Sequence, residues 1–519
     1  MQVVQNKALL FTTDKHAQIT ALIPKSKVMG ESDGEAEVLV DWSFDSWRIL
    51  RNLGVDDAPH PILGRYKWPG VYTPFEHQRT TAAFLASNPR CYCLNEAGTG
   101  KTSAAAWAAD YLLTKGVINR VLIICPLSIM DTAWRADLFR TVMHRSVGIA
   151  TGSKRQREEI INSDVEFVII NFDGVKVVPE ALRNGGFDLI IIDEATAIKT
   201  VTTDRWKIIN SLVKPNTWVW AMTGTPAAQS PEDAYGIARF VRPESVPKYF
   251  NTWRDKVMLK VTQFKWVPKA NSQQTVYDTL QPAIRYTKEE CLDLPDILYA
   301  TREVPLTPQQ NKYYARIKQE MVALAAGEEI TAANAASMLN KLLQISQGAV
   351  YTDTGEVIEF DIKPRLAELT SIIDSTAHKV LVFVPFRHVT ELLKAALVQH
   401  LGDPNMVEVI QGGVSAGARA ETIKRFQTED NPKVLLLAPA ATAHGITLTK
   451  ADQIVWWGPI PSTEYYLQAN ARAHRAGQTN KVTVTHLQGS PVERHMYTML
   501  QGKIDLHQSL VELYKQEIS

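Results

Sequence analysis

Residues 91–113 read CYCLNEAGTGKTSAAAWAADYLL, which is a strand-like run, a glycine-rich turn and an alanine-rich helix in direct succession. A helix that starts directly after such a turn points unpaired backbone N–H groups at it, and these groups can cradle phosphate oxygens. Gly98 and Gly100 let the backbone on either side of Thr99 approach a phosphate. Lys101 can neutralise phosphate charge, and Thr102 can hold Mg²⁺. The stretch predicts a nucleoside triphosphate site, and a turn that is glycine-rich by chance is the alternative for an isolated match.

Short apolar runs alternate with helical stretches in two separate parts of the chain. The first part contains CYCLN, VLIIC, EFVII, DLIIID and TWVWAM, and the second contains KVLVFV, VEVI, KVLLLA, QIVWW and VTVTHL. Such alternation indicates a parallel sheet covered by helices on both faces. We therefore expect an α/β fold with two parallel-sheet lobes, a helical insertion between them and a small N-terminal module.

The same pattern divides the chain into five expected segments. Residues 1–70 form an N-terminal module of unknown role, 71–245 the first lobe, 246–362 a helical protrusion or linker, 363–490 the second lobe, and 491–519 a C-terminal helix. Several domains are expected of 519 residues, because one hydrophobic core rarely serves so long a chain.

Composition constrains partners and location only weakly. The 56 lysines and arginines balance 55 acidic residues, so any nucleic-acid track must come from local charge. No apolar run approaches membrane-spanning length and the start lacks a secretory signal, so we expect a cytoplasmic protein with no membrane partner. The four cysteines have no metal-ligand spacing, and we expect buried thiols at Cys91, Cys93, Cys125 and Cys291.

A second motif, DLIIIDEATAIK, ends a buried strand in two carboxylates. Asp193 is the natural ligand of Mg²⁺, and Glu194 is the natural base to orient or activate water. Open α/β sheets bind ligands at the carboxyl ends of their strands, where these residues are expected. An acid-rich helix N-terminus is the alternative for the motif alone.

Two further segments extend the predicted site. Thr223 and Thr225 follow the strand TWVWAM and could relay the state of the terminal phosphate, or they form a simple strand-to-helix turn. Gln78, in TPFEHQRTTAAFL, precedes the loop strand where an amide could read an adenine edge; a surface glutamine is the alternative.

The stretch STEYYLQANARAHRAGQ supplies arginines that can stabilise the charge on a transferred phosphoryl group. Arg472 and Arg475 are three residues apart, so we expect them on one helix face, with Gln468 one turn earlier. If all three point into the seam between the lobes, hydrolysis becomes relative motion of the lobes. A solvated arginine pair is the alternative.

These residues together resemble the two-lobed helicases with tandem RecA-like domains, and within them the SWI/SNF-type ATPases. AGTGKT, DEATAIK, TGTP and QANARAHRAGQ stand in the family's order, and RAHRAGQ is the most specific of them. LQPAIRYTKEECLDLP, VSAGARAETIKRFQ, ITLTKADQIVWW and GSPVERHMYTMLQGK are weaker echoes. The resemblance covers roughly residues 71–515.

The resemblance implies an ATP site and a nucleic-acid motor. The implied ATP-site residues are Lys101, Thr102, Asp193, Glu194, Gln468, Arg472 and Arg475. It also implies a loop at Gly445 that senses nucleotide or DNA, ATP and Mg²⁺ as cofactors, and ATP-driven tracking along duplex or branched DNA. Departures at Thr196, APAATAH and GPIPSTEYY affect the expected DNA grip, and are similar to compact members from bacterial viruses. We expect a monomer that works in a bacterial host cytoplasm, with replication or recombination proteins as partners.

Backbone contacts to DNA would come from loops at one side of each sheet. The candidates are Ser128, Lys199, Arg419 and Lys424, each of which could equally be a solvated side chain. Two other functions stay open: a conventional strand-separating DNA or RNA helicase, and a nucleotide-switched binding scaffold without productive turnover.

Overall fold

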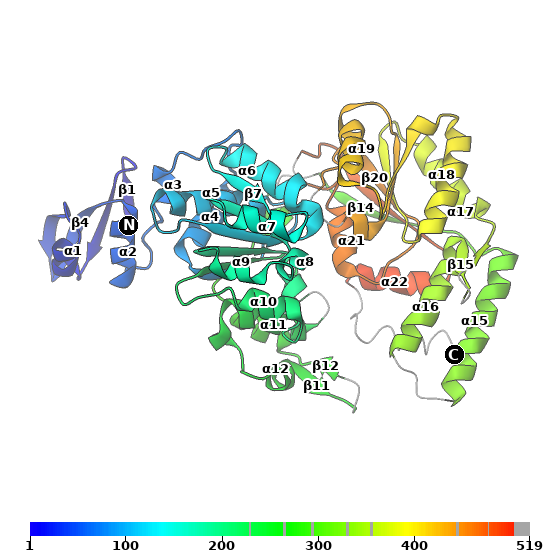
Figure 1. Cartoon of the computed structure of the whole chain (residues 1–519), viewed down its shortest axis with the longest axis horizontal. Coiled ribbons are helices and arrows are strands. Elements are labelled where there is room, and N and C mark those ends of the chain that lie inside the picture. The colour runs from blue at the N-terminus through cyan, green and yellow to red at the C-terminus, as the bar shows by residue number, and fades with distance from the viewer. Residues whose placement is uncertain are drawn as a thin grey trace.

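The computed structural model describes residues 1–227, 230–262, 266–291, 295–327, 332–352, 356–442, 446–475 and 477–502. Figure 1 shows two helix-covered sheets side by side, with a small module beyond the first of them at the N-terminal end. The expected α/β fold with two parallel-sheet lobes is confirmed. Across these ranges, no helix has both the length and the apolar character that a membrane crossing requires.

The N-terminal module is an antiparallel sheet with short helices. Its strands run in the order β1-β2-β4-β3. Its elements are β1 (Gln2–Val4), β2 (Ala8–Thr13), α1 (His16–Leu22), β3 (Lys27–Ser32), β4 (Glu35–Asp41), α2 (Phe44–Asn52) and α3 (Ile62–Arg65). Along β4, Ala36, Val38 and Val40 are fully buried while Glu35 and Glu37 are exposed. This period of two gives the sheet one face for the core and one for solvent.

The first lobe is built on a seven-stranded parallel sheet in the order β13-β5-β10-β9-β6-β8-β7. Its strands are β5 (Arg90–Cys93), β6 (Val121–Cys125), β7 (Val147–Ile149), β8 (Phe167–Asn171), β9 (Leu189–Asp193), β10 (Trp218–Met222) and β13 (Ala283–Ile284). Its helices are α4 (Glu76–Ser87), α5 (Lys101–Thr114), α6 (Ala136–Thr141), α7 (Lys154–Ile161), α8 (Phe172–Val175), α9 (Pro179–Asn184), α10 (Asp204–Asn210) and α11 (Ala234–Val241). Every residue of β6, β8 and β9 is buried, as expected for strands covered on both faces.

The register of this sheet brings the three predicted motifs of the first lobe together. Cys93 pairs with Met222, and Met222 pairs with Asp193, so β5, β10 and β9 are neighbours that end level with one another. The glycine-rich turn, the TGTP turn and the acidic pair each follow one of these strands. They therefore meet at the carboxyl edge of the sheet, where α/β folds bind ligands.

The second lobe has a six-stranded sheet in the order β14-β21-β20-β17-β19-β18, with parallel pairing throughout. Its strands are β14 (Ile297–Glu303), β17 (Lys379–Phe383), β18 (Val407–Ile410), β19 (Val434–Leu437), β20 (Ala451–Trp456) and β21 (Val482–Gln488). Its helices are α17 (Lys363–Asp374), α18 (Arg387–Leu401), α19 (Ala416–Thr428), α20 (Pro439–Thr442), α21 (Thr463–Asn470) and α22 (Pro491–Leu500). Residues 503–519 of the expected C-terminal segment lie outside the described ranges.

The expected helical segment 246–362 is shared among three parts of the structure. It begins with α12 (Phe250–Val257), the hairpin β11 (Met258–Lys260) and β12 (Trp266–Pro268), and α13 (Ser272–Thr279). β13 then joins the first sheet and, after α14 (Lys288–Cys291), β14 joins the second. Only then come the long helices α15 (Pro308–Gly327) and α16 (Ala332–Gln347), with the hairpin β15 (Ala349–Tyr351) and β16 (Val357–Glu359). Both joining strands are edge strands with little buried surface, so they carry no apolar signal in the sequence.

Three of the four cysteines are buried as expected. Cys91, Cys93 and Cys125 lie in β5 and β6 with no exposed surface. Cys291 is only half-buried, because it ends the short helix α14 outside the core.

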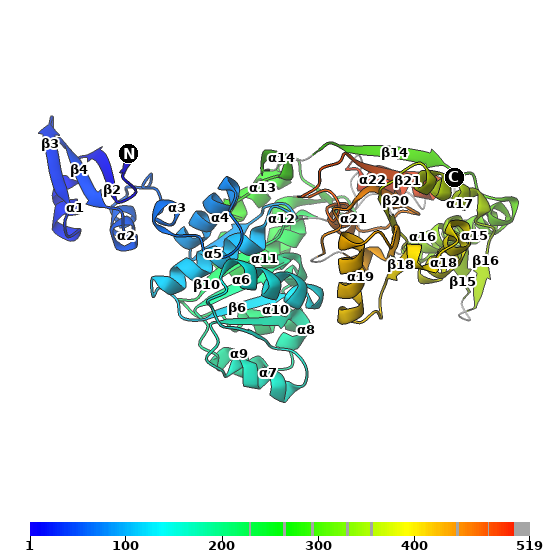
Figure 2. The same ribbon diagram turned by 90° about the horizontal axis from the view of Figure 1, so that it is seen from above.

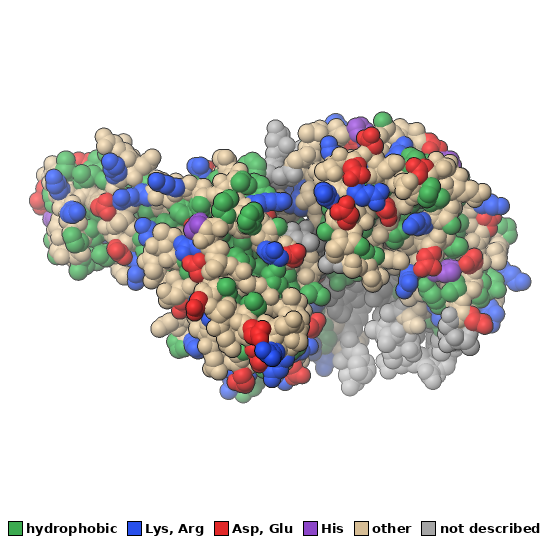
Figure 3. All heavy atoms as spheres, turned by 45° about the horizontal axis from the view of Figure 1, so that its top comes forward, with side chains coloured by type: hydrophobic (Ala, Val, Ile, Leu, Met, Phe, Trp, Pro, Cys, Tyr) green, Lys and Arg blue, Asp and Glu red, His purple; other side chains and the backbone are tan. Residues whose placement is uncertain are grey.

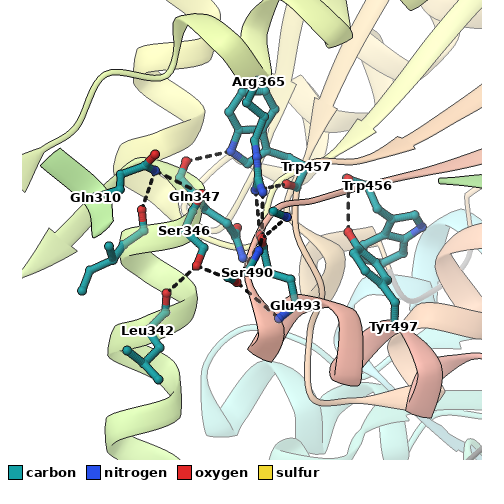
Figure 4. Close-up of polar contacts among 12 residues, drawn as sticks. Gln310, Leu342, Ser346, Gln347, Arg365, Trp456, Trp457, Ser490, Glu493 and Tyr497 are labelled. Atoms are coloured by element: carbon teal, nitrogen blue, oxygen red, sulfur yellow. Dashed lines mark hydrogen bonds and ion pairs between the residues drawn. The ribbon is translucent and has the colours of Figure 1, made fainter. Parts of the chain in front are cut away.

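A buried ion pair joins α17 to α22 in the second lobe, and the long helix α16 contacts α22 beside it (Figure 4). Arg365 Nη1 and Nη2 donate to the two carboxylate oxygens of Glu493 at 2.7 and 2.8 Å, and Nη1 also donates to Trp457 O at 2.8 Å. Ser490, at the start of α22, accepts a hydrogen bond on its hydroxyl from Ser346 of α16 at 2.9 Å. α16, α17 and α22 thus meet at one set of charged and polar groups.

Replacing Arg365 with methionine is expected to destabilise the second lobe by about 3–5 kcal/mol, since the buried Glu493 carboxylate would lose its counter-charge. The free energy of unfolding in urea measures this loss. Arg387→Met is the matched control, because Arg387 and Glu391 form an exposed pair worth about 0–1 kcal/mol. Equal effects of the two substitutions would contradict a role for the buried pair in holding the helices.

Candidate active site between the two lobes

The glycine-rich turn places a lysine at the start of a helix. Gly98 and Gly100 have φ of 93° and 78°, a left-handed conformation that favours glycine, and α5 begins at Lys101. The Lys101 ammonium donates to Asn95 O at 2.8 Å and to Glu96 O at 3.2 Å. A cation is unfavourable at a helix N-terminus, so this arrangement suits the binding of an anion.

Gln78 packs against this turn and is not a surface residue. Its side chain is 8% exposed, accepts a hydrogen bond from Phe75 N at 2.9 Å and donates to Gly100 O at 3.5 Å. A Cβ on Gly100 would lie 2.0 Å from Gln78 Nε2, so only glycine allows this contact. Gln78 is therefore placed beside the loop, and its reading of an adenine edge stays a prediction.

Asn95, which directly follows the loop strand and Leu94, ties the loop to its surroundings. Its buried amide donates to Thr81 Oγ1 at 2.9 Å and accepts from Tyr286 N at 3.0 Å. Thr99, which is also predicted to lie in the loop, is buried, and its hydroxyl donates a hydrogen bond to Glu96 O at 2.8 Å. The loop is thus held by α4 on one side and by the chain after β13 on the other.

The acidic pair lies at the end of β9 in a buried position. Asp193 accepts from Trp134 Nε1 at 2.8 Å and from Glu194 N at 3.1 Å, one bond on each carboxylate oxygen. Burial raises the pKa of Asp193, and the Lys101 ammonium opposes that rise. Trp134, from the stretch between β6 and α6, is a site residue that the sequence did not indicate.

Glu194 combines a strained backbone with a raised pKa. Its φ of 58° is in the left-handed region, which costs energy for a residue with a side chain and is common at functional sites. Burial and the neighbouring Asp193 raise the pKa of Glu194 to about 7, while Lys101 and Arg472 oppose the shift. The carboxyl group can therefore accept a proton near neutral pH, which is the property of a general base.

The predicted TGTP turn packs directly on the phosphate loop. A Cβ on Gly224 would lie 3.5 Å from Asn95 O, Glu96 Cα and Ala97 N. Thr223 is buried, and its hydroxyl accepts from Thr225 N at 3.2 Å. The turn is placed where a change at the phosphates would reach it, and the coupling role of Thr223 and Thr225 stays a prediction.

The expected helix face of Arg472 and Arg475 is wrong, because α21 ends at Asn470. The backbone carbonyl of Arg472 accepts from Leu448 N at 2.9 Å, so it is not available for a helical bond. Gln478 Nε2 donates to Thr449 O at 3.1 Å, Ala451 O at 2.9 Å and Ala473 O at 3.2 Å. Packing against residues 446–451 thus sets the path of this segment.

The two arginines nevertheless converge, and one of them meets the first lobe. Arg472 Nη1 and Arg475 Nη1 both donate to Ile446 O, at 3.5 and 3.2 Å. A Cβ on Gly98 would lie 3.4 Å from Arg475 Cβ, so Arg475 lies against the phosphate loop. Burial lowers the pKa of Arg475 and lowers that of Arg472 to about 10, with Glu194 opposing the shift of Arg472.

Gln468 contacts the first lobe through a residue that the sequence did not indicate. Glu464, one helical turn earlier on α21, accepts from Gln468 Nε2 and from Thr196 Oγ1, both at 3.2 Å on Oε1. The Thr196 hydroxyl makes this hydrogen bond between the two lobes. Burial raises the pKa of Glu464, and the Thr196 hydrogen bond opposes the rise.

The candidate DNA residues are spread over both lobes. Ser128 is half-buried after β6, and Lys199 forms an ion pair with Asp233 at 3.2 Å. Arg419 is half-buried and Lys424 exposed, both on α19. In Figure 3 lysines and arginines alternate with acidic residues over both lobes, in line with the balanced composition. DNA contact at these four residues stays a prediction, and Gly445 lies outside the described residues.

Comparison with known proteins finds two family domains in the chain. The SNF2-related domain matches residues 14–349 and the helicase conserved C-terminal domain matches residues 364–477, so the match begins within the N-terminal module. A chromodomain-helicase-DNA-binding protein 1-like of Danio rerio is 26% identical, over 81% of this chain and 42% of that protein. The SWI/SNF-related matrix-associated actin-dependent regulator of chromatin subfamily A-like protein 1 of Xenopus laevis is 25% identical, over 89% of this chain and 50% of that protein.

Two more comparisons cover most of the chain. The putative ATP-dependent helicase/translocase YwqA of Bacillus subtilis is 24% identical, over 98% of this chain and 58% of that protein. The Sulfolobus solfataricus SWI2/SNF2 ATPase core in complex with dsDNA is 20% identical, with a TM-score of 0.42, over 87% of this chain and 97% of that chain. The chain spans about half the length of the curated relatives it matches. Since the SNF2-related domain matches well over half of its residues, the chain belongs to the SNF2-related domain family.

Proposed function

We propose that this protein is an ATP-hydrolysing motor that moves along duplex or branched DNA. One observation carries the proposal: Arg475 of the second lobe lies against Gly98 of the phosphate loop in the first. A nucleotide in that loop is enclosed by groups from both lobes, so the loss of its terminal phosphate changes what holds the lobes together. Hydrolysis is thereby coupled to relative motion of the lobes.

The residues of the cleft divide the chemistry among them. Backbone N–H groups of the loop and Lys101 bind the phosphates, and Glu194 orients the attacking water and accepts its proton. Arg472 and Arg475 stabilise the charge that develops on the transferred phosphoryl group. Because the surrounding protein desolvates both arginines, their electrostatic effect on that charge is stronger than it would be in water.

The donor groups in the cleft fit Mg²⁺. Thr102 supplies a hydroxyl and Asp193 a carboxylate, and each carboxylate oxygen of Asp193 accepts a single hydrogen bond and keeps a lone pair. Mg²⁺ bound there supplies positive charge to the phosphate oxygens. Trp134 Nε1 and the backbone N–H of Glu194 fix the orientation of the Asp193 carboxylate, which would hold the ion together with Thr102.

DNA as the partner rests on the family and on the names of its relatives. An ATP-dependent helicase/translocase and chromodomain helicase-DNA-binding proteins are among them. Duplex DNA would bridge the lobes through backbone contacts, for which Ser128, Arg419 and Lys424 are candidates. Lys199 is the weakest of the four candidates, because its ion pair with Asp233 must be broken first.

The steady-state ATPase rate of the full chain tests the proposal. It is measured without nucleic acid and with duplex DNA, forked DNA, single-stranded DNA and RNA, each at two salt concentrations. We expect the strongest stimulation with duplex or forked DNA, weaker at high salt because phosphate contacts release counterions. Stimulation by single strands or RNA alone would favour a conventional helicase, and ATP binding without turnover in every arm would favour a switched scaffold.

A further inference from the structure

The chain that connects the two sheets runs along the phosphate loop. β13 pairs in parallel with β5 at the edge of the first sheet. Beyond the strand, Leu94 N donates to Ile284 O at 2.8 Å and Glu96 N donates to Tyr286 O at 2.9 Å. The backbone N–H of Lys288 donates to Glu96 Oε2 at 3.1 Å. Residues 282–288 therefore follow the loop strand up to the glycine-rich turn.

Lys288 extends its side chain to the same glycine that Arg475 contacts. A Cβ on Gly98 would lie 3.6 Å from Lys288 Cε and 3.4 Å from Arg475 Cβ. The connecting chain and the second lobe thus each bring a basic side chain to Gly98. The position of Lys288 follows from an edge strand, and the stretch LQPAIRYTKEECLDLP that contains it supplied no candidate site residue in the sequence.

Four cations, Lys101, Lys288, Arg472 and Arg475, lie in the cleft together with the carboxylates of Glu96, Asp193, Glu194 and Glu464. Burial is the largest cause that lowers the pKa of Lys288, which is about 8. The charges of Arg472, Arg475 and Lys101 lower this pKa further, and the Glu96 carboxylate opposes them. Burial and repulsion from the neighbouring cations make the ammonium form of Lys288 less favourable, and the phosphates of a bound nucleotide would stabilise that form. A nucleoside triphosphate bound in the loop would reduce the electrostatic repulsion between Lys288 and these cations.

We propose that Lys288 is a phosphate-binding residue, which holds the terminal phosphates of the nucleotide from the chain that connects the lobes. The inference rests on the proposed function and adds a fourth cation to the site. It also gives the phosphates a direct connection to the second lobe, because Lys288 is nine residues before β14 in the sequence. β14 pairs with β21 along all seven of its residues.

A second contact fixes the other end of this connecting chain. His474, between the two arginines, shares a hydrogen bond of 2.9 Å with Pro295 O. Figure 2 shows α14 beside the first lobe and β14 along the second. The connecting chain is thus held at two points. Lys288 lies at the phosphate loop, and Pro295 is bonded to His474 of the arginine segment.

The test is the affinity of the full chain for ATP, ADP and adenosine, with Lys288→Gln and Lys288→Arg. A charge-assisted phosphate contact predicts about 10- to 100-fold weaker ATP binding for Lys288→Gln, with adenosine unchanged and Lys288→Arg close to the natural protein. Lys115→Gln, an exposed lysine at the far end of α5, is the matched control and leaves all three affinities unchanged.

The pH dependence separates charge from packing. In the free protein the pKa of Lys288 is about 8, and a bound phosphate raises it, so ATP affinity falls as pH rises above 8. The Lys288→Arg variant keeps its charge and loses this fall. The charged and titratable groups that face Lys288 are Glu96, Lys101, Arg472, Arg475 and His474.

Unchanged ATP affinity in Lys288→Gln, or an equal loss for ATP and adenosine, would overturn the assignment of Lys288. Lys101→Ala distinguishes this failure from a failure of the proposed function. If Lys101→Ala abolishes ATP turnover while Lys288→Gln changes no affinity, the proposed function is supported and Lys288 does not bind phosphate. If ATP turnover survives Lys101→Ala, the nucleotide site itself is wrongly placed.

Discussion

Replacing Arg475 with alanine is expected to lower the ATP turnover number by about 10³- to 10⁵-fold while ATP binding changes little. The arginine acts mainly on charge that develops in the transition state, and such an interaction affects kcat more than affinity. Arg475 reaches from the second lobe to Gly98 of the phosphate loop, so it lies where the phosphates of a bound nucleotide would be. The measurement is kcat at saturating ATP together with the Kd for ATP in the same buffer.

Two variants make the Arg475 result interpretable. Arg475→Lys keeps the positive charge but loses the planar fork of donors, so it should recover only part of the turnover. Arg387→Ala, on an exposed helix of the same lobe, should leave turnover unchanged. A loss of ATP affinity with kcat intact would show that Arg475 binds the ground state and has no special role in the reaction.

The buried strands and the nucleotide motifs were predictable because both depend on local sequence. Runs such as VLIIC and DLIIID are apolar throughout, since the strands they form are covered on both faces. The motifs follow the strands directly, so parallel pairing alone brings them to one edge. Lys101, Asp193 and Glu194 could therefore be assigned to one site before their distances were known.

Residues that join the site through long-range packing were not predictable. Trp134 lies 59 residues before Asp193, and Glu464 lies 268 residues after Thr196, so no spacing rule relates them. β14 has mostly exposed residues and no apolar alternation, although it pairs along its whole length with β21. The segment that carries Arg472 and Arg475 is not helical, because Leu448 N and Gln478 Nε2 donate hydrogen bonds to the carbonyl oxygens of Arg472 and Ala473. This is again an effect of tertiary packing.

Replacing Glu194 with glutamine is expected to lower ATP turnover by about 10²- to 10⁴-fold, because the amide cannot accept a proton from the attacking water. Glutamine has nearly the same shape, so it can occupy the left-handed position of Glu194 at the same backbone cost. ATP should still bind and should still bring the arginines of the second lobe to the loop. The measurement is single-turnover hydrolysis together with the Kd for ATP.

This variant also separates the motor from the scaffold. A motor with Glu194→Gln holds ATP without releasing phosphate, so it should stay on duplex DNA in the ATP-bound state and dissociate slowly. A scaffold does not depend on turnover, so its DNA binding and release would be the same with Glu194 or glutamine. Dissociation from labelled duplex DNA with ATP, compared between the two proteins, gives the answer. The glutamine amide also lacks the negative charge by which Glu194 repels Asp193 and Glu464, so the substitution should not weaken ATP binding. Any loss of ATP affinity in this variant would therefore contradict the role of Glu194 as a base that acts only on water.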